Sequence, residues 1–202
     1  MKPSVILPKI QIDVPSPFLL HLSQEKRQDY KRVRKMNEKR LTWDQYFMLN
    51  AHLISMRSTC NRLNVGSVLV KNNRIISTGY NGGISGEEHC LDAGCYVENN
   101  HCLRCLHSEE NAILQCALQG VSTKGSQIYV THFPCVHCMK KILQAGITKI
   151  YYNYDYKNHD YCYHLLEISN VEAIKMEVKI ENYIDDEHGT TGALNWNFEP
   201  RG

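Results

Sequence analysis

The stretch that decides the fold is residues 127–152, QIYVTHFPCVHCMKKILQAGITKIYY. β-branched and aromatic residues dominate 127–131 and 149–152, which predicts two short buried strands. Between them a helix is expected to begin at Pro134 and to end near Gly146. Proline suits the first helical position because the N–H that it lacks has no partner there. The stretch therefore predicts a strand, a helix and a second strand in succession.

Single helices and strands alternate along the rest of the chain as well. The expected elements are a helix with Thr42 as its N-cap, a hairpin of strands at 65–70 and 74–78, a long polar loop at 79–106, helices at 107–118 and 161–168, and a strand at 173–178. This alternation predicts an α/β domain whose helices pack against a mixed sheet. We expect the domain at 41–180, between an extension at 1–40, which joins an extended arm to a basic helix, and a polar tail at 181–202.

The composition is that of an ordinary soluble protein, since 43% of the 202 residues are apolar and 22% are charged. No apolar stretch approaches the length that spans a bilayer, so we expect no membrane association. Pro3, Pro8, Pro15 and Pro17 interrupt the apolar start of the chain. These prolines argue against a secretory signal and predict a cytoplasmic protein.

Positive charge is concentrated in one segment. Residues 24–40 hold eight Lys/Arg against three Asp/Glu, while the whole chain carries a net charge of +2, so the remainder sums to −3. A polyanion-binding surface needs an excess of basic side chains. The charge pattern therefore argues against a nucleic-acid partner for the body of the protein.

Cysteine usage points to a metal. Nine cysteines is an odd number, and six of them lie between Cys60 and Cys116, among several histidines. In a chain of this size without an export signal, this pattern favours metal binding or thiol chemistry over a disulfide framework.

Two short segments carry the strongest chemical signal, namely HSE at 107–109 and PCVHC at 134–138. A C-x-x-C pair alone is ambiguous, because it also occurs in thioredoxin-like redox sites, in zinc ribbons and in buried cores. An upstream H-x-E at an expected helix start removes much of that ambiguity. The combination is a known signature of zinc deaminases.

The pattern is chemically coherent. Three ligands, His107, Cys135 and Cys138, leave one tetrahedral position for water, as a catalytic zinc site requires. A helix N-terminus stabilises thiolates through its dipole and its free N–H groups. Glu109 is then the acid–base residue, which would take a proton from the attacking water, protonate ring N3 and deliver a proton to the departing amine. An isolated glutamate in a first helical turn is more often a surface residue, and the neighbouring His107 reverses that interpretation.

Five stretches extend the signature: TWDQYFM, RSTCNRLNVGSVLV, TGYNGGISG, HSEENAILQC and YVTHFPCVHCMKKILQAGI. From Thr42 to about Ile168 the chain resembles the deoxycytidylate deaminase family, in particular its bacterial competence-operon branch. The resemblance implies a cytidine-deaminase-like, three-layer α/β/α fold with a central five-stranded mixed sheet. It also implies conversion of dCMP to dUMP and ammonia for thymidylate synthesis, and a homo-oligomer, commonly a hexamer. Regulation by dCTP, with Mg²⁺, and by dTTP is expected on the same ground. Ser108 departs from the family, where an alanine usually stands between the histidine and the glutamate.

The resemblance also implies substrate contacts. Asn81 is expected to bind the sugar 3′-hydroxyl, although Asn-Gly is also a turn dipeptide by its own chemistry. The backbone N–H of Ser108 is expected to meet the pyrimidine carbonyl. Phe133 is expected to line the nucleotide pocket. The phosphate is expected to be bound by Arg62, His101, Tyr156 and Lys157. Taken singly, each of these four residues is at least as compatible with a solvated surface position.

A second, structural zinc is expected in the long loop, held by Cys60, Cys90, Cys95 and Cys102. The loop contains few apolar residues, and a metal would explain its order. The alternative is a cluster of reduced, partly buried thiols. Cys105, Cys116 and Cys162 are interpreted as spare apolar residues.

Two competing functions are compatible with the motif. A polynucleotide deaminase acting on tRNA or single-stranded DNA would need a basic, aromatic groove, and the near-neutral body argues against one. A zinc-stabilised interaction module without catalysis is the other alternative, and the intact H-x-E and P-C-x-x-C segments count against it.

Overall fold

The computed structural model describes residues 23, 24, 28 and 41–178. Apart from the three isolated positions, the predicted extension at 1–40, with its basic helix, and the predicted tail at 181–202 lie outside the described residues. Among the helices that the structure describes, none is both long enough and apolar enough to cross a membrane.

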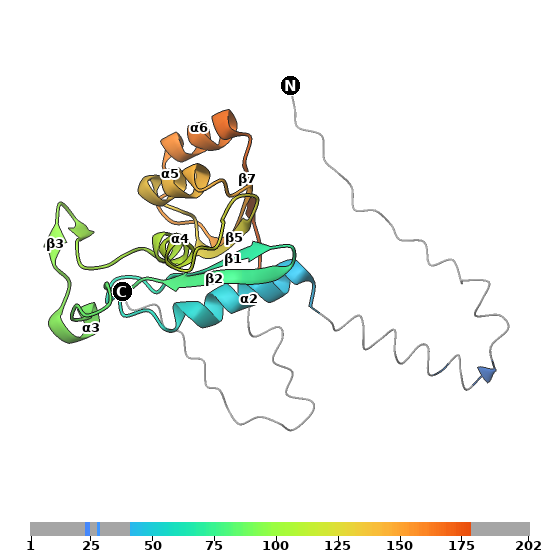
Figure 1. Ribbon diagram of the computed structural model, residues 1–202, viewed down its shortest axis with the longest axis horizontal. Coiled ribbons are helices and arrows are strands. Elements are labelled where there is room, and N and C mark those ends of the chain that lie inside the picture. The colour runs from blue at the N-terminus through green and yellow to red at the C-terminus, as the bar shows by residue number, and fades with distance from the viewer. Residues whose placement is uncertain (1–22, 25–27, 29–40, 179–202) are drawn as a thin grey trace. The chain divides into compact units, whose positions relative to one another are not determined.

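The centre of the domain is a five-stranded mixed sheet in the order β2-β1-β5-β6-β7 (Figure 1). β1 (Gly66–Lys71) pairs antiparallel with β2 (Arg74–Tyr80) and with β5 (Gln127–His132). β5, β6 (Lys149–Tyr154) and β7 (Glu172–Lys175) run parallel to one another. The predicted five-stranded mixed sheet is therefore confirmed.

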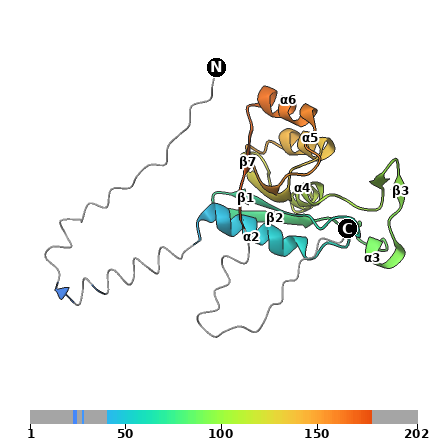
Figure 2. The ribbon, with the colours of Figure 1, turned by 180° about the vertical axis from the view of Figure 1, so that it is seen from behind.

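Helices cover both faces of this sheet. α2 (Trp43–Ser55) packs on one face, and α4 (Ser108–Leu118), α5 (Val136–Gln144) and α6 (Asp160–Ser169) pack on the other, as both views show (Figures 1 and 2). The strands alternate between two buried clusters, because successive side chains of a strand point to opposite faces. Val68, Val70, Tyr129 and Tyr151 face α2. Leu69, Ile128, Val130 and Ile150 face the other three helices. This confirms the three-layer α/β/α architecture.

Local chemistry explains two of the predicted boundaries. The Thr42 hydroxyl accepts the Gln45 backbone N–H at 3.2 Å, and the Gln45 side chain accepts the Thr42 N–H at 2.9 Å, which forms a capping box at the start of α2. Asn72 and Asn73 form the two-residue turn between β1 and β2 with φ of 52° and 55°. Asparagine tolerates this left-handed backbone, so the hairpin prediction is confirmed.

Three differences from the predicted elements have physical causes. The loop at 79–106 contains a short helix, α3 (Cys90–Ala93), and a hairpin of β3 (Val97–Glu98) and β4 (His101–Cys102). Its turn repeats the Asn-Asn signal, since Asn99 and Asn100 also have positive φ. Pro134 does not begin α5, because Cys135 has extended backbone and is the N-cap. The last strand ends at Lys175 rather than at 178.

Candidate active site

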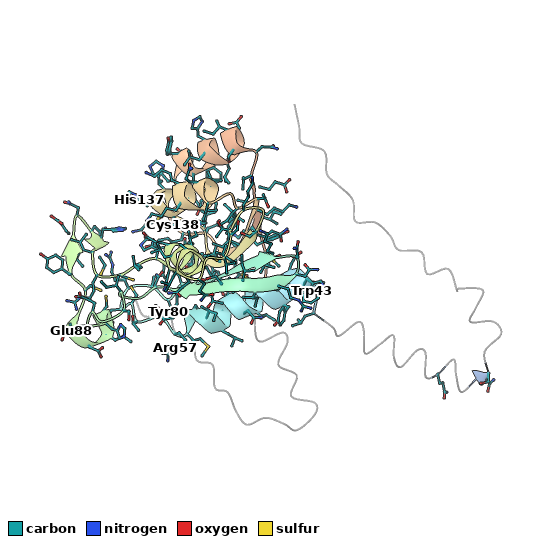
Figure 3. The ribbon with its side chains drawn as sticks, in the orientation of Figure 1. Trp43, Arg57, Tyr80, Glu88, His137 and Cys138 are labelled. Carbon is teal, nitrogen blue, oxygen red and sulfur yellow. The ribbon has the colours of Figure 1, made fainter. Side chains whose placement is uncertain are left out.

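α4 and α5 both begin at predicted metal ligands. His107 is the N-cap of α4, and Cys135 is the N-cap of α5. Each has extended backbone and makes no side-chain capping bond, so its donor atom is left for other contacts. Cys138 lies one turn into α5, at the end that faces the β3–β4 hairpin (Figure 3).

The three donor atoms have the spacing of a tetrahedral zinc site. His107 Nδ1 lies 3.5 Å from the sulfur of Cys135 and 3.5 Å from the sulfur of Cys138. Bonds of about 2.0 Å from zinc to nitrogen and about 2.3 Å to sulfur, at a tetrahedral angle, place nitrogen and sulfur about 3.5 Å apart. All three donor atoms lie within 4.8 Å of one another. The residues present therefore fit a zinc ion with one position left for water.

The electrostatics favour a thiolate at Cys135. A hydrogen bond from the Cys138 thiol, supported by His107, lowers the pKa of Cys135 to about 3. The same pairing raises the pKa of Cys138, and the hydrogen bond to Cys135 raises the pKa of His107. A divalent cation bound here would need both sulfurs deprotonated and the imidazole neutral, so its binding would release the protons that these groups hold.

Glu109 is buried beside this triad, with 4% of its surface exposed. Burial raises the pKa of its carboxyl above the ordinary range, although its own backbone N–H, the charge of His107 and the Ser108 hydroxyl oppose that shift. The next residue, Glu110, is paired with Lys141 of α5 at 2.5 Å and is partly exposed. Of the two adjacent glutamates, Glu109 is thus the one that is buried beside the triad, and Glu110 is the one that pairs with Lys141.

Asn81 and Ser108 join the loop after β2 to the start of α4. Asn81 Oδ1 accepts the Ser108 backbone N–H at 2.8 Å, and its Nδ2 donates to the carbonyl of Leu63 at 2.9 Å. The Ser67 hydroxyl in β1 donates to the Ser108 carbonyl at 2.8 Å. In this structure the Ser108 N–H is thus used by Asn81, and its contact with a pyrimidine carbonyl stays a prediction.

A cavity of about 190 Å³ opens at the triad. Most of the predicted site residues line it, and the members of this set are Cys60, Arg62, Asn81, His101, Cys102, His107, Glu109, Phe133, Cys135, Tyr156 and Lys157. Ser108 and Cys138 are buried behind this lining. A larger surface hollow of about 1080 Å³ between α4, α5 and α6 contains none of the three metal-binding residues, so the smaller cavity is the candidate site.

The predicted phosphate contacts lie in two groups. Arg62 donates from both terminal guanidinium nitrogens to the backbone carbonyl and to the side chain of Asn100, each at 3.0 Å. This contact holds the hairpin that carries His101, whose ring centre lies 5.3 Å from that of His107. Tyr156 and Lys157 follow β6, and the Lys157 ammonium lies over the Tyr156 ring. Arg62 therefore contacts the hairpin in this structure, whereas Lys157 contacts Tyr156 in the segment after β6.

Sequence reasoning missed several residues that line the cavity, namely Leu63, Val65, Asn100, Cys105 and His132. His132 has the clearest sequence signal. It ends a strand that leads directly into P-C-x-x-C, and ligands of α/β sheets gather at the carboxyl ends of parallel strands.

A second group of thiols lies beside the cavity. Cys90, Cys95 and Cys102 lie with their sulfurs within 4.8 Å of one another, and the sulfurs of Cys90 and Cys102 are 3.7 Å apart. Two sulfurs on one tetrahedral zinc are expected about 3.8 Å apart. Cys60 is not part of this group. A hydrogen bond from Cys105 lowers the pKa of Cys60 to about 5. Three of the four predicted ligands are thus brought together. Cys105 is not a spare apolar residue, because it pairs with Cys60 and lines the cavity.

Known proteins are similar to this chain in sequence. Residues 41–154 match the family described as the cytidine and deoxycytidylate deaminase zinc-binding region. The chain is 49% identical to ComE operon protein 2 of Bacillus subtilis (strain 168) over 148 residues, which are 71% of this chain and 78% of that protein. It is 37% identical to the deoxycytidylate deaminase of Schizosaccharomyces pombe, and the match covers 73% of this chain but only 48% of the yeast protein.

A solved structure is similar as well. It is the crystal structure of dCMP deaminase from the cyanophage S-TIM5 in complex with dCMP and dUMP. The superposition has a TM-score of 0.57 at 34% identity and covers 77% of this chain and 100% of the phage chain.

Proposed function

Because the chain belongs to the family of cytidine and deoxycytidylate deaminases, we propose that it hydrolyses dCMP to dUMP and ammonia. The observation that carries this proposal is the buried carboxyl of Glu109 beside a His107, Cys135 and Cys138 triad with zinc spacing. The deoxycytidylate deaminases among its relatives, and the similar phage structure with dCMP and dUMP, support the choice of substrate.

The reaction adds water to C4 of the cytosine ring and releases the exocyclic amine as ammonia. A zinc ion held by His107, Cys135 and Cys138 would lower the pKa of a water molecule that it binds. Glu109 would accept a proton from the attacking water, protonate ring N3, and later supply a proton to the leaving amine. Its raised pKa suits this shuttle, because the carboxyl must both gain and release a proton near neutral pH.

Selection of a monophosphate would depend on the residues at the mouth of the cavity. Tyr156 offers a hydroxyl, and Lys157 offers a charge that is exposed to solvent. His101 belongs to the hairpin on the other side, held by the contact between Arg62 and Asn100. We propose that these two sides hold the sugar phosphate while Phe133 packs against the base.

We also propose a structural zinc ion at Cys90, Cys95 and Cys102. The 3.7 Å separation of two of the sulfurs supports it. The ion would fix the loop that carries β3 and β4, which form only a two-residue pairing.

The test of the catalytic function is ammonia release from dCMP, CMP, deoxycytidine and a short cytosine-containing DNA strand, each with and without dCTP. Wild type and Glu109→Ala are compared at equal zinc content. Turnover of dCMP by wild type alone would support the proposal. Preferred turnover of the DNA strand would indicate a polynucleotide deaminase instead, and no turnover of any substrate by the zinc-loaded protein would indicate an interaction module.

Some properties rest only on the resemblance to the family. These are regulation by dCTP and dTTP, Mg²⁺ bound with dCTP, assembly into a hexamer and a role in thymidylate synthesis. They stay predictions, and the dCTP arm of the assay tests the first of them.

A further inference from the structure

His132 ends β5 and lines the candidate cavity, yet neither the metal triad nor the proton shuttle uses it. It pairs in register with Tyr154 of the neighbouring parallel strand, and its ring centre lies 6.1 Å from that of Tyr156 at an interplanar angle of 86°. His132, Tyr156 and Lys157 therefore form one wall of the cavity, at the carboxyl ends of β5 and β6.

The hydrogen bonds around His132 determine which ring nitrogen carries the proton. The Gly66 backbone N–H donates to Thr131 Oγ1 at 3.3 Å, and Thr131 Oγ1 lies 2.9 Å from His132 Nδ1. A hydroxyl that already accepts one hydrogen bond still has its own proton to donate. We assign the Thr131 hydroxyl as the donor to Nδ1, which leaves the proton of the neutral ring on Nε2.

The Nε2–H of His132 is left for a ligand. No residue that the structure describes accepts a hydrogen bond from this nitrogen. The nitrogen is not fully buried. Burial, with the nearby charge of His52, lowers the pKa of the ring to about 4. The side chain is thus neutral at physiological pH and presents a fixed donor to the cavity.

Resting on the proposed function, we infer that His132 is a phosphate-binding residue whose Nε2–H donates to the 5′-phosphate of the nucleotide. Tyr156 and Lys157 supply a hydroxyl and a positive charge on the same wall. A neutral, oriented donor adds a directional contact that a flexible ammonium does not provide. Glu109 and this wall line the same cavity, so a nucleotide whose amine lies at Glu109 would have its phosphate at this wall if the inference holds.

The experiment compares two substitutions of His132 whose side-chain amides differ in length. Glutamine places its amide N–H near the position of Nε2, whereas asparagine is one methylene shorter and reaches only the position of Nδ1. His132→Asn is expected to lower kcat/KM for dCMP by about tenfold to a hundredfold, the usual effect of losing a hydrogen bond to a charged group. His132→Gln is expected to retain most of the activity. For deoxycytidine, which has no phosphate, both variants are expected to stay within about threefold of wild type.

A binding measurement separates this inference from the proposed function. Calorimetric titration of dCMP and deoxycytidine into zinc-loaded Glu109→Ala, with and without His132→Asn, needs no turnover. Weaker binding of dCMP alone would support the phosphate contact even if the wild type proved inactive on dCMP. Equal losses for both ligands, or none for either, would overturn it. An effect of His132→Asn that disappears in a Tyr156→Ala background would also overturn it, because His132 would then act only by holding Tyr156.

Discussion

The Ser108 hydroxyl donates a 3.0 Å hydrogen bond to Oε2 of Glu109, and both side chains are buried. The Ser108 hydroxyl is thus directed at the carboxylate for which we propose the acid–base role. A donor at this position favours the ionised carboxylate and fixes its rotamer. The hydrogen bond therefore offsets part of the rise in the pKa of Glu109 that burial causes.

Ser108→Ala is expected to lower kcat for dCMP by about threefold to tenfold, because a buried carboxylate loses one oriented donor. Zinc content should not change. Ser77→Ala is the matched control, since the Ser77 hydroxyl donates to the Ala112 carbonyl of the same helix without touching Glu109. An equal fall in kcat for the two variants, measured by ammonia release, would mean that the Ser108 contact is only structural.

Glu109→Gln keeps the shape of the side chain and removes the transferable proton. Its kcat is expected to fall by about a thousandfold or more, a typical loss for a general acid–base group. Glu110→Gln is the control, because it breaks the pair with Lys141, which is partly exposed and worth at most about 1 kcal/mol. Both proteins should keep the wild-type zinc content. Substantial dCMP turnover by Glu109→Gln would refute the acid–base role.

Metal analysis of the purified protein is expected to give two zinc ions per chain. Cys135→Ser should lose the catalytic ion and all turnover, whereas Cys102→Ser should lose the other ion and lower the thermal midpoint. Cys116→Ser removes a core thiol that belongs to neither group of ligands and should retain both ions. A single zinc in the wild type, unchanged in Cys102→Ser, would leave only the triad as a metal site.

Stability should depend on pH through His132. Its pKa is lowered to about 4 from an ordinary 6.5, so below pH 6.5 the unfolded chain binds a proton that the folded chain does not. The stabilisation is therefore present above pH 6.5 and is lost as the pH falls from there through about 4. Urea unfolding at pH 7 and pH 5 should show a smaller loss for His132→Gln than for wild type. Identical losses would show that the ring titrates normally.

Gly79 allows α4 to approach β2. A Cβ built there would lie 2.1 Å from the Ser108 carbonyl oxygen and 2.5 Å from the Ala112 nitrogen, both backbone atoms that cannot move aside cheaply. Gly79→Ala is expected to cost about 2 kcal/mol or more of unfolding free energy. It should also lower activity, because it displaces the turn that carries Glu109. Gly83→Ala, whose Cβ would meet its nearest atom at 3.7 Å, should be close to neutral by the same denaturation measurement.

The amino-acid sequence alone determined the architecture and the core of the chemistry. Alternating apolar residues in the strands, the Thr42 cap and the Asn72-Asn73 turn act over a few residues, so their outcome could be predicted locally. The H-x-E and P-C-x-x-C segments were sufficient for the triad and for Glu109, because each places its donors by helix geometry at a helix N-terminus. Pro134 was misassigned because a proline fits both just before an N-cap and just after it.

Tertiary structure decided the contacts between segments that are far apart in the chain. The pairing of Cys105 with Cys60, the contact of Arg62 with Asn100 and the place of His132 in the cavity lining depend on how loops meet around the sheet. No local pattern encodes these contacts, because hydrogen-bond partners and burial are set by the packing of the whole domain. The sequence therefore determined which chemistry this protein carries, and the packing of its layers decided which side chains remain free to meet a substrate.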